Sequence, residues 1–422
     1  MLRPTIPHFS LIFALLCVLA ASVQAGEFRF FGQTDKDPLQ YVAGEEMTFT
    51  VQLLEDGKPI SGKTLKWSRR GDDGLTDKGE AIADAEKPLT IKTSISTPGF
   101  VHINVQAYDE NGQVLKNGNQ NMPAFDGGAG VRLDEIQGYA EPADFDEFWN
   151  KQKARLAEVP IKATMTEVES GNENVLCYDI RIDCVGKAVS GYYCKPRDAK
   201  PKSLPAYVSF QGYGVHSAGK QPWATDKLAL QINAHGIDNG QPAEYYENLR
   251  NTTLRGYAFS TEENVRPETS YFCGMMLRVM RALQWIKTQP EWNGEVLVVG
   301  GGSQGGLQCL TAAGLDPDVT ECNAVVPWCL DLAGHKMLNR LNGWRPEWAE
   351  GLGYFDAATH AKRIQCKTII SAGLGDYVCP PSGQMVLYNN LKCPKKLTFN
   401  QGRTHGYMMP NGSVSVLEDM KE

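Results

Sequence analysis

A serine between two glycines, placed directly after an apolar run, constrains the fold more than any other segment of the chain. The run Leu297–Val299 is typical of a buried strand, and it continues into Gly301, Ser303 and Gly305, which match the pattern Gly-x-Ser-x-Gly. In that pattern the serine occupies a strained turn from a strand into a helix, where side chains at the glycine positions would clash with neighbouring elements. A phosphate-binding loop is the alternative, but its lysine is missing. The segment therefore predicts a nucleophilic serine at Ser303.

The order of residues after Ser303 supports this interpretation. Chains with such a nucleophile carry an Asp or Glu next and a His last. The stretch Thr368–Ala372 is typical of a strand, and its exit loop contains Asp376. The next strand-like stretch ends near His405. A serine hydroxyl is a weak nucleophile, so His405 is predicted to accept its proton, and Asp376 to orient the imidazole and stabilise its cation.

Other residues compete for these two roles. Asp331 and Asp356 also follow the serine, but only Asp376 closely follows a strand at the expected place. His335 and His360 lie between the serine and the acid, so they break the expected order. Chain order therefore leaves one histidine, at position 405.

A tetrahedral intermediate also needs two donors for its oxyanion. The backbone N–H of Gln304, the residue after the nucleophile, is the first expected donor. The second is expected from the loop after an earlier strand, and Ala206–Phe210 runs into such a loop, where glycines flank Tyr213. The Tyr213 N–H is therefore a candidate, and a plain turn is the alternative for that loop.

The first 25 residues have the pattern of a cleaved secretory signal peptide. An apolar run from Phe9 to Ala21 follows a positively charged start, and small residues at positions 23 and 25 precede Gly26. The run is shorter than the roughly 20 residues that span a bilayer, so no stable membrane anchor is expected. We predict a secreted or periplasmic protein. Most cysteines of the mature chain are expected to be buried packing residues, and their pairing is left open.

The mature chain is expected to contain two domains. Residues 27–125 show alternating patterns such as Met47–Leu53, with turns that contain Gly and Pro, and predict a small immunoglobulin-like β-sandwich. A Gly-rich linker is predicted over residues 126–140. Residues 141–422 alternate strands and helices, which predicts a mostly parallel sheet covered on both faces, as in an α/β-hydrolase domain. All five candidate site residues lie there, so the β domain is expected to have no part in the chemistry.

Composition excludes several functions. The formal net charge of −7 disfavours nucleic acid as a partner, because nucleic-acid binding depends on positive charge. No His-Glu-x-x-His or comparable ligand cluster occurs, so neither a metal nor a cofactor is expected.

At these motifs the sequence resembles the acetyl xylan esterase / cephalosporin C deacetylase family of carbohydrate esterases, from roughly Glu141 to the C-terminus. The matching segments are Pro142–Trp149 as an entry helix, Gly301–Gly306 as the family's Gly-x-Ser-Gln-Gly-Gly, and Asp376–Ser382 as the acid loop. The resemblance implies that Ser303, Asp376 and His405 form the catalytic triad, and that Tyr213 and Gln304 form the oxyanion hole. It also implies a small acetylated carbohydrate as substrate.

Two segments depart from the family. The family usually has Arg-Gly-Gln before the nucleophile, where this chain has Asn233–Gly236, and Glu after the catalytic His, where this chain has Gly406. Family members often form hexameric rings and lack a leader. This chain has a predicted leader and an added β domain, so homo-oligomerisation is left open for it.

Two other functions compete with an acetyl esterase. A serine peptidase of the prolyl oligopeptidase type shares the motif and chain order, but about 100 residues cannot form its β-propeller, which needs roughly 40–50 residues per blade. A non-catalytic carbohydrate-binding protein on a hydrolase fold is disfavoured by the complete Ser, Asp and His set. For the acyl pocket, bulky side chains that would admit little more than a methyl group are expected among Tyr213, Tyr245, Tyr246 and Trp328.

Overall fold

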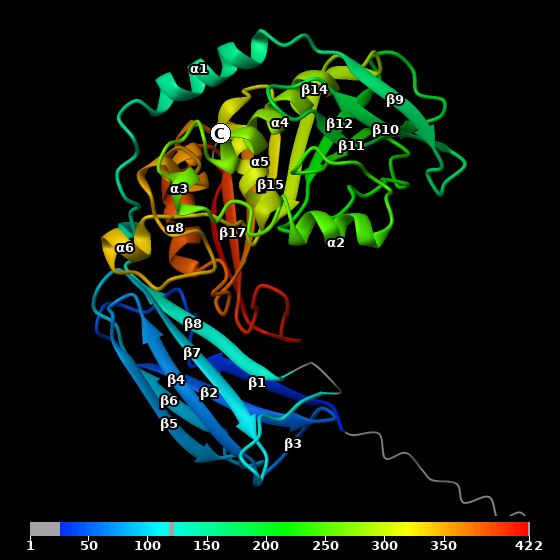
Figure 1. Cartoon of the computed structure of the whole chain (residues 1–422). Coiled ribbons are helices and arrows are strands. Elements are labelled where there is room, and N and C mark those ends of the chain that lie inside the picture. The colour runs from blue at the N-terminus through cyan, green and yellow to red at the C-terminus, as the bar shows by residue number, and fades with distance from the viewer. Residues whose placement is uncertain (1–25, 118–121, 421–422) are drawn as a thin grey trace, which may run out of the picture.

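The computed structural model describes residues 26–117 and 122–420, which form a β-sandwich and a larger α/β domain (Figure 1). The predicted signal peptide lies outside the described residues. Two four-stranded sheets build the sandwich, and their apolar faces share one core. One sheet contains β1 (Phe28–Thr34), β2 (Met47–Glu55), β3 (Lys58–Pro59) and β6 (Leu89–Thr93). The other has the order β5 (Thr76–Ile82), β4 (Thr64–Gly71), β7 (Gly99–Tyr108) and β8 (Ala124–Val131).

The predicted start of the linker is wrong, because Gly127–Gly130 lies within strand β8, which pairs with β7 along its length. The glycines are required by close packing rather than by a flexible loop. A side-chain carbon at Gly128 would lie 2.7 Å from the Val101 carbonyl oxygen and 2.9 Å from that of Leu374 in the α/β domain. The sandwich therefore extends to Val131, and its last strand packs directly on the other domain.

A ten-stranded sheet forms the centre of the α/β domain, and six adjacent strands in it are parallel. Its order is β18 (Val414–Asp419), β17 (Lys395–Asn400), β16 (Lys367–Gly373), β15 (Glu321–Val325), β14 (Trp292–Gly302), β12 (Leu204–Phe210), β13 (Leu228–Ile232), β11 (Val189–Pro196), β10 (Val175–Ile182) and β9 (Ala163–Val168). Parallel strands present their carboxyl ends at one edge, which is where α/β sheets bind ligands. The expected strands over residues 206–210 and 296–299 are present as parts of β12 and β14.

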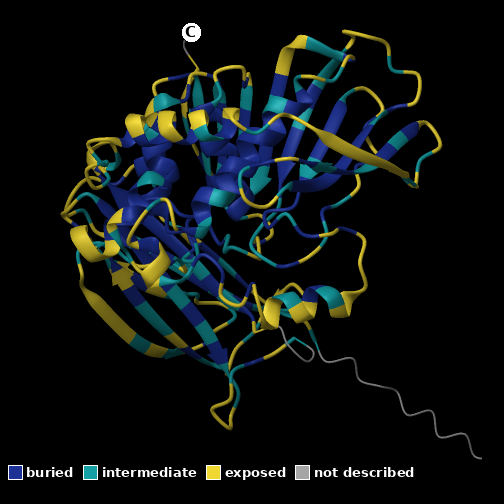
Figure 2. Ribbon diagram, turned by 45° about the horizontal axis from the view of Figure 1, so that its top comes forward, coloured by how far each residue is buried: buried dark blue, intermediate teal, exposed yellow. Residues whose placement is uncertain are grey.

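The helices that cover this sheet are largely buried on their inner faces (Figure 2). The longest, α4, runs from Tyr271 to Ile286, and α5 (Gln304–Leu315) packs against it and against β14 and β15. The remaining helices are η1 (Leu133–Glu135), α1 (Phe145–Ala157), α2 (Ala243–Asn251), α3 (Thr261–Asn264), α6 (Gly334–Leu338), η2 (Glu350–Tyr354), α7 (Ala357–His360), η3 (Ala361–Arg363) and α8 (Pro381–Asn390). The expected amphipathic helix over residues 275–286 is thus the main part of α4.

The two domains are joined by specific contacts. The Gln401 side chain donates to the Gly128 carbonyl and accepts from the Gly128 N–H, both at 2.9 Å. Phe100 of the sandwich belongs to the core of the α/β domain and lies 5.8 Å, between ring centroids, from Phe399. Because buried amide hydrogen bonds and an aromatic contact connect the two domains, the sandwich packs directly against the larger domain.

All cysteines of the described ranges are buried, as expected for packing residues. None of them is in a disulfide there. Among the same residues, no helix combines the length and apolar character needed to cross a bilayer.

Candidate active site

Ser303 lies between β14 and α5, on a turn with φ 56° and ψ −120°. This left-handed backbone is unfavourable for a residue with a side chain and is typical of strain at a functional site. The flanking glycines are required sterically. A side-chain carbon at Gly301 would lie 2.5 Å from the Gly305 carbonyl carbon, and one at Gly305 would collide with the Phe210 carbonyl oxygen. The turn therefore has the strand-to-helix geometry expected from the motif.

The His405 imidazole lies between the serine and the acid. Its Nε2 is 3.0 Å from Ser303 Oγ, and its Nδ1 is 2.9 Å from Asp376 Oδ2. Each residue follows the carboxyl end of a parallel strand, namely β14, β16 and β17. The His405 side chain is 25% exposed whereas that of Asp376 is 1% exposed, so a substrate can reach the imidazole but not the acid. The structure thus brings together the three side chains expected from chain order.

The Asp376 carboxylate is held by two further hydrogen bonds. Its Oδ1 accepts from the backbone N–H groups of Val378 at 3.0 Å and Cys379 at 2.9 Å. This leaves Oδ2 for the imidazole and fixes the orientation of the carboxylate. The charged acid thereby favours the tautomer of His405 that has its proton on Nδ1, with Nε2 free to accept from the serine.

The competing acids and histidines have structural partners elsewhere. Asp331 forms an ion pair with Arg340 at 2.5 Å. Asp356 caps α7 by accepting from the Ala358 N–H, and the buried His360 bonds the Tyr354 carbonyl. His335 Nδ1 lies 2.8 Å from the Arg340 carbonyl oxygen. These contacts stabilise loops and give none of the four a bond to Ser303.

The two expected oxyanion donors lie beside the nucleophile. The loop after β12 passes so close that a side-chain carbon at Gly212 would lie 3.9 Å from Ser303 Cβ. Among the described residues, neither the Tyr213 nor the Gln304 backbone N–H has a hydrogen-bond acceptor. Gln304 is also the first residue of α5, where the helix dipole favours negative charge. Both N–H groups are therefore available to an oxyanion.

Sequence reasoning missed the residues that hold the loop after β12 in place. This loop carries Tyr213 and Gly214 and is called the oxyanion loop below, after the role expected for the Tyr213 N–H. The Tyr257 hydroxyl accepts from the Gly214 N–H and donates to Gln304 Oε1, both at 2.9 Å, so it links the two donor segments. His235 Nε2 lies 2.9 Å from the Gly214 carbonyl oxygen, and the Tyr271 hydroxyl lies 2.6 Å from His235 Nδ1. The only sequence signal was the departure from the family at residues 233–236, which contains His235 but does not reveal its partners.

Burial lowers the pKa of His235 to about 4, so it stays neutral in the folded protein well below the pH at which it is protonated in the unfolded chain. The unfolded state therefore binds more protons, and this histidine's contribution to stability is lost as the pH falls from about 6.5 towards 4. We expect the free energy of unfolding to fall more steeply with acidification in the wild type than in His235→Gln. The expected difference in slope is at most about 1.4 kcal/mol per pH unit, measured by denaturant unfolding.

The comparison with the variant is necessary because burial raises the pKa of Asp356 to about 6, which has the opposite effect in the same pH range. Glutamine keeps a donor for the Gly214 carbonyl but cannot titrate. If the free energy of unfolding changes equally with pH in the two proteins, His235 is not held in its neutral form by burial.

Aromatic side chains form a wall close to the oxyanion loop. The Tyr213 ring centroid lies 5.6 Å from that of Trp328 and 4.7 Å from that of Trp344, and Phe259 lies 4.8 Å from Trp344. The backbone N–H of Trp328 donates to the Ser303 carbonyl at 3.0 Å, which connects this wall to the nucleophile. Tyr213 and Trp328, two of the four residues expected for the acyl pocket, thus belong to this aromatic wall.

The other two expected pocket residues lie elsewhere. Tyr245 and Tyr246 both lie on α2, and their hydroxyls bond Asp238 instead. Nothing in the sequence distinguished these tyrosines from Trp344 and Phe259, because segments distant in the chain decide which aromatic rings pack on Tyr213.

Asp376, Cys379 and His405 offer three donor atoms within 4.8 Å of one another. They are a poor metal site. The Asp376 and His405 atoms already bond each other, and burial raises the pKa of the Cys379 thiol, which favours the protonated form over the thiolate that binds metals.

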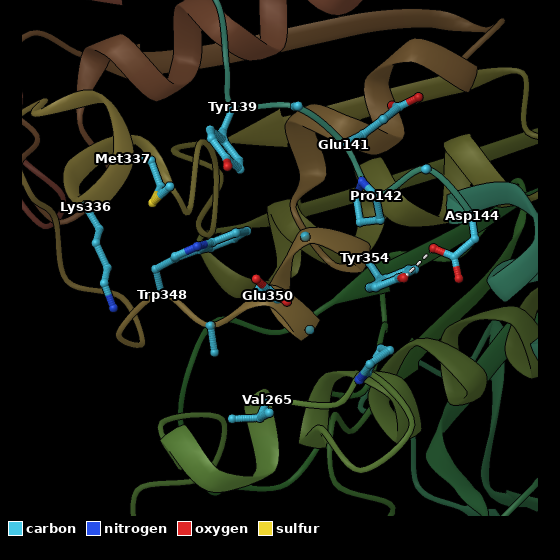
Figure 3. Close-up of a pocket in the computed structure, with 16 residues that line it drawn as sticks. Tyr139, Glu141, Pro142, Asp144, Val265, Lys336, Met337, Trp348, Glu350 and Tyr354 are labelled. Atoms are coloured by element: carbon cyan, nitrogen blue, oxygen red, sulfur yellow. Dashed lines mark hydrogen bonds between the residues drawn. The ribbon is translucent and has the colours of Figure 1, made fainter.

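A cavity of about 790 Å³ lies away from these residues, and Figure 3 shows its sixteen lining residues. They include Tyr139, Trp348 and the Tyr354 hydroxyl, which bonds Asp144, but no serine, threonine, cysteine or histidine. A smaller cavity of about 480 Å³ reaches His405. Size alone therefore does not locate the chemistry in this protein.

The sheet topology and the turn at Ser303 define an α/β-hydrolase fold, as expected from the sequence. Residues 129–418 match the model of the family described as acetyl xylan esterase (AXE1). The chain belongs to this family of carboxylic ester hydrolases, and the resemblance read from the motifs is confirmed.

Individual relatives agree with this assignment. Acetyl esterase Axe7A of Xylanibacter ruminicola is 29% identical over 274 residues, which are 60% of this chain and 61% of that protein. An acetyl xylan esterase from Paenibacillus sp. R4 has a TM-score of 0.54 and 25% identity, over 65% of this chain and 93% of its own. Acetyl xylan esterase 1 from Thermoanaerobacterium sp. JW/SL YS485 has a TM-score of 0.52 and 23% identity, over 66% and 94%, and shows the fold alone.

Proposed function

We propose that this chain is a serine esterase that removes acetyl groups from acetylated carbohydrates such as xylan fragments. The observation that carries the proposal is the position of the His405 imidazole, 3.0 Å from Ser303 Oγ and 2.9 Å from Asp376 Oδ2. Membership of the acetyl xylan esterase family supports an acetyl ester as the substrate.

In the first half-reaction, Ser303 Oγ attacks the acetyl carbonyl carbon while His405 Nε2 accepts the hydroxyl proton. The carbonyl oxygen becomes negatively charged and is stabilised by the N–H groups of Tyr213 and Gln304. The bond to the alcohol then breaks, and His405 returns the proton to the departing sugar oxygen. The acetyl group stays bonded to Ser303.

In the second half-reaction, a water molecule gives its proton to His405 Nε2 and attacks the acetyl-serine carbonyl. The same two N–H groups stabilise the second oxyanion. Collapse of this intermediate releases acetate and returns the proton to Ser303. Asp376 orients the imidazole and stabilises its cation in both half-reactions.

We expect the enzyme to prefer acetyl esters over longer acyl chains, because the rings of Trp328 and Tyr213 pack 5.6 Å apart on two segments that adjoin the nucleophile. Each methylene that meets such a wall changes the transition-state free energy by about 1–3 kcal/mol. The specificity constant kcat/KM should therefore fall from p-nitrophenyl acetate to butyrate, and octanoate should be nearly inert.

The acyl series should be measured beside acetylated xylan and a peptide panel. Acetate release from xylan together with a falling acyl series supports the proposal. A rise in kcat/KM from acetate to octanoate would instead indicate a lipase-like esterase, and cleavage of amides would indicate a peptidase. Absence of any hydrolysis would support a non-catalytic carbohydrate-binding role.

The first 25 residues support a second proposal, export to the periplasm or the medium. Acetylated plant polysaccharide and its fragments are met outside the cytoplasm, so this location fits the proposed substrate. Cell fractionation, with the N-terminal residue of the mature protein determined by mass spectrometry, tests it. We expect a chain that begins at Gly26.

A further inference from the structure

The outer face of the sandwich sheet β5-β4-β7-β8 has a row of polar side chains. Ser68 of β4 lies opposite Asn104 of β7, which lies opposite Asp126 of β8. One step along the sheet, Arg70 lies opposite His102. Residues directly opposite or two apart share a face, so these five side chains form one polar patch. The alternate residues of β7, such as Ile103, point into the sandwich core.

This patch borders the active site. The cavity of about 480 Å³ that reaches His405 is lined on one side by the five patch residues. Its other side consists of parts of the loops that follow β16 and β17, which carry Asp376 and His405. The sandwich therefore lies directly beside the site.

Several polar atoms of the patch lack a protein partner. Asp126 Oδ1 is engaged by His102 Nε2 at 2.8 Å and by Asn104 Nδ2 at 3.0 Å, so the carboxylate is held in place. Among the described residues, no donor bonds Asp126 Oδ2 or Asn104 Oδ1, and the Ser68 hydroxyl makes no hydrogen bond. A fixed carboxylate, an amide oxygen and a hydroxyl can each accept from the hydroxyl groups of a sugar.

We propose that this cavity is the subsite for a neutral sugar unit on the alcohol side of the scissile ester, built by the β-sandwich. The inference rests on the proposed carbohydrate esterase function. His405 must deliver a proton to the departing sugar oxygen, so the alcohol side of the substrate lies against this imidazole. His405 lines the same cavity as the patch, so a sugar chain bound at this imidazole would continue along the patch residues. The sandwich thus selects the leaving group while the aromatic wall selects the acyl group.

A second cavity, of about 450 Å³, extends the same interface between the domains. It shares Asp126, Thr404 and Gly406 with the first cavity and includes the Tyr407 side chain, which is 42% exposed. An exposed tyrosine offers an apolar ring face and a polar tip, which suits a sugar ring with its apolar face and hydroxyl rim. Longer oligosaccharides should therefore gain affinity over single acetylated sugars.

The test compares two substrates in the full-length protein. The double variant Ser68→Ala/Asn104→Ala should lower kcat/KM on acetylated xylotetraose at least about tenfold, since two hydrogen bonds to the sugar are lost. On p-nitrophenyl acetate its kcat/KM should stay within about twofold of the wild-type value, because the nitrophenyl group makes neither bond. Ser68→Trp, which fills the cavity, should have the same selective effect.

The matched control is Lys66→Ala/Gln106→Ala, a directly opposed pair on the same strands and face that does not line the cavity. It should leave both substrates unchanged. Calorimetric binding of unacetylated xylotetraose to Ser303→Ala protein gives a readout without turnover, and adding Ser68→Ala/Asn104→Ala should weaken that binding at least about tenfold.

The outcomes separate the two proposals. If the wild type hydrolyses p-nitrophenyl acetate but no acetylated oligosaccharide, the carbohydrate function fails, and the subsite fails with it. If the wild type accepts the oligosaccharide and the patch variants retain full activity on it, the subsite alone is overturned. An equal loss on both substrates would also overturn it, since the variants would then act by disturbing His405.

Discussion

Replacing Ser303 by alanine is expected to lower kcat on p-nitrophenyl acetate by about 10⁶-fold, the loss typical when the nucleophile of a serine triad is removed. The fold should persist. Within the described part of the chain, the Ser303 hydroxyl bonds only His405. Alanine meets the same backbone strain at φ 56° because it has the same Cβ atom. Circular dichroism and the thermal midpoint should therefore match the wild type within experimental error.

Ser203→Ala is the matched control, because this exposed serine hydroxyl bonds the Lys200 carbonyl at 2.8 Å, far from the triad in the sequence. It should leave kcat unchanged. Turnover close to the wild-type rate in a Ser303→Ala preparation free of contaminating esterase would refute the assignment of Ser303 as nucleophile.

Asp376→Asn is expected to have the second-largest effect, a loss of about 10⁴-fold in kcat. Two backbone N–H groups bond Asp376 Oδ1, so the amide oxygen of asparagine would occupy that position and its NH₂ group would face His405 Nδ1. The imidazole would then accept at Nδ1 and place its proton on Nε2. In that tautomer it cannot accept the proton of Ser303.

The control is Asp331→Asn, which alters the acid that pairs with Arg340 and should keep kcat near the wild-type value. The two variants together decide which acid serves the histidine. A large loss in Asp331→Asn with a small one in Asp376→Asn would mean that chain order and the hydrogen bonds at His405 identify the wrong acid.

The two domain types and the arrangement around the nucleophile were predictable from the sequence because they depend on local patterns. Alternation along Met47–Leu53 describes a strand with one buried face, and this is β2 in the structure. Glycines at positions 301 and 305 are needed wherever a serine occupies such a turn, because the clash is with atoms a few residues away or in the next strand. The order of Ser303, Asp376 and His405 follows from the order of the parallel strands that carry them.

The linker was mispredicted because glycine has two uses that look the same in a sequence. Gly127–Gly130 could have been a flexible connection, but these residues form a strand whose missing side chains allow close packing on Leu374. That contact joins residues about 250 positions apart, so no local pattern contains it. Composition shows that a segment is rich in glycine, whereas only packing shows why.

The strand-to-helix turn at Ser303 and the order of its partners follow from the amino-acid pattern, since local steric limits and strand order leave few alternatives. Which residues support and surround that turn depends on the packing of distant segments. Tyr257 and His235 hold the oxyanion loop, Trp344 rather than Tyr246 packs beside Tyr213, and Asp126 of the sandwich faces the cavity at His405. Each of these contacts joins segments that are distant in the chain, and their polar or aromatic residue types suit a surface equally well. Only the folded arrangement of the two domains places them around one serine.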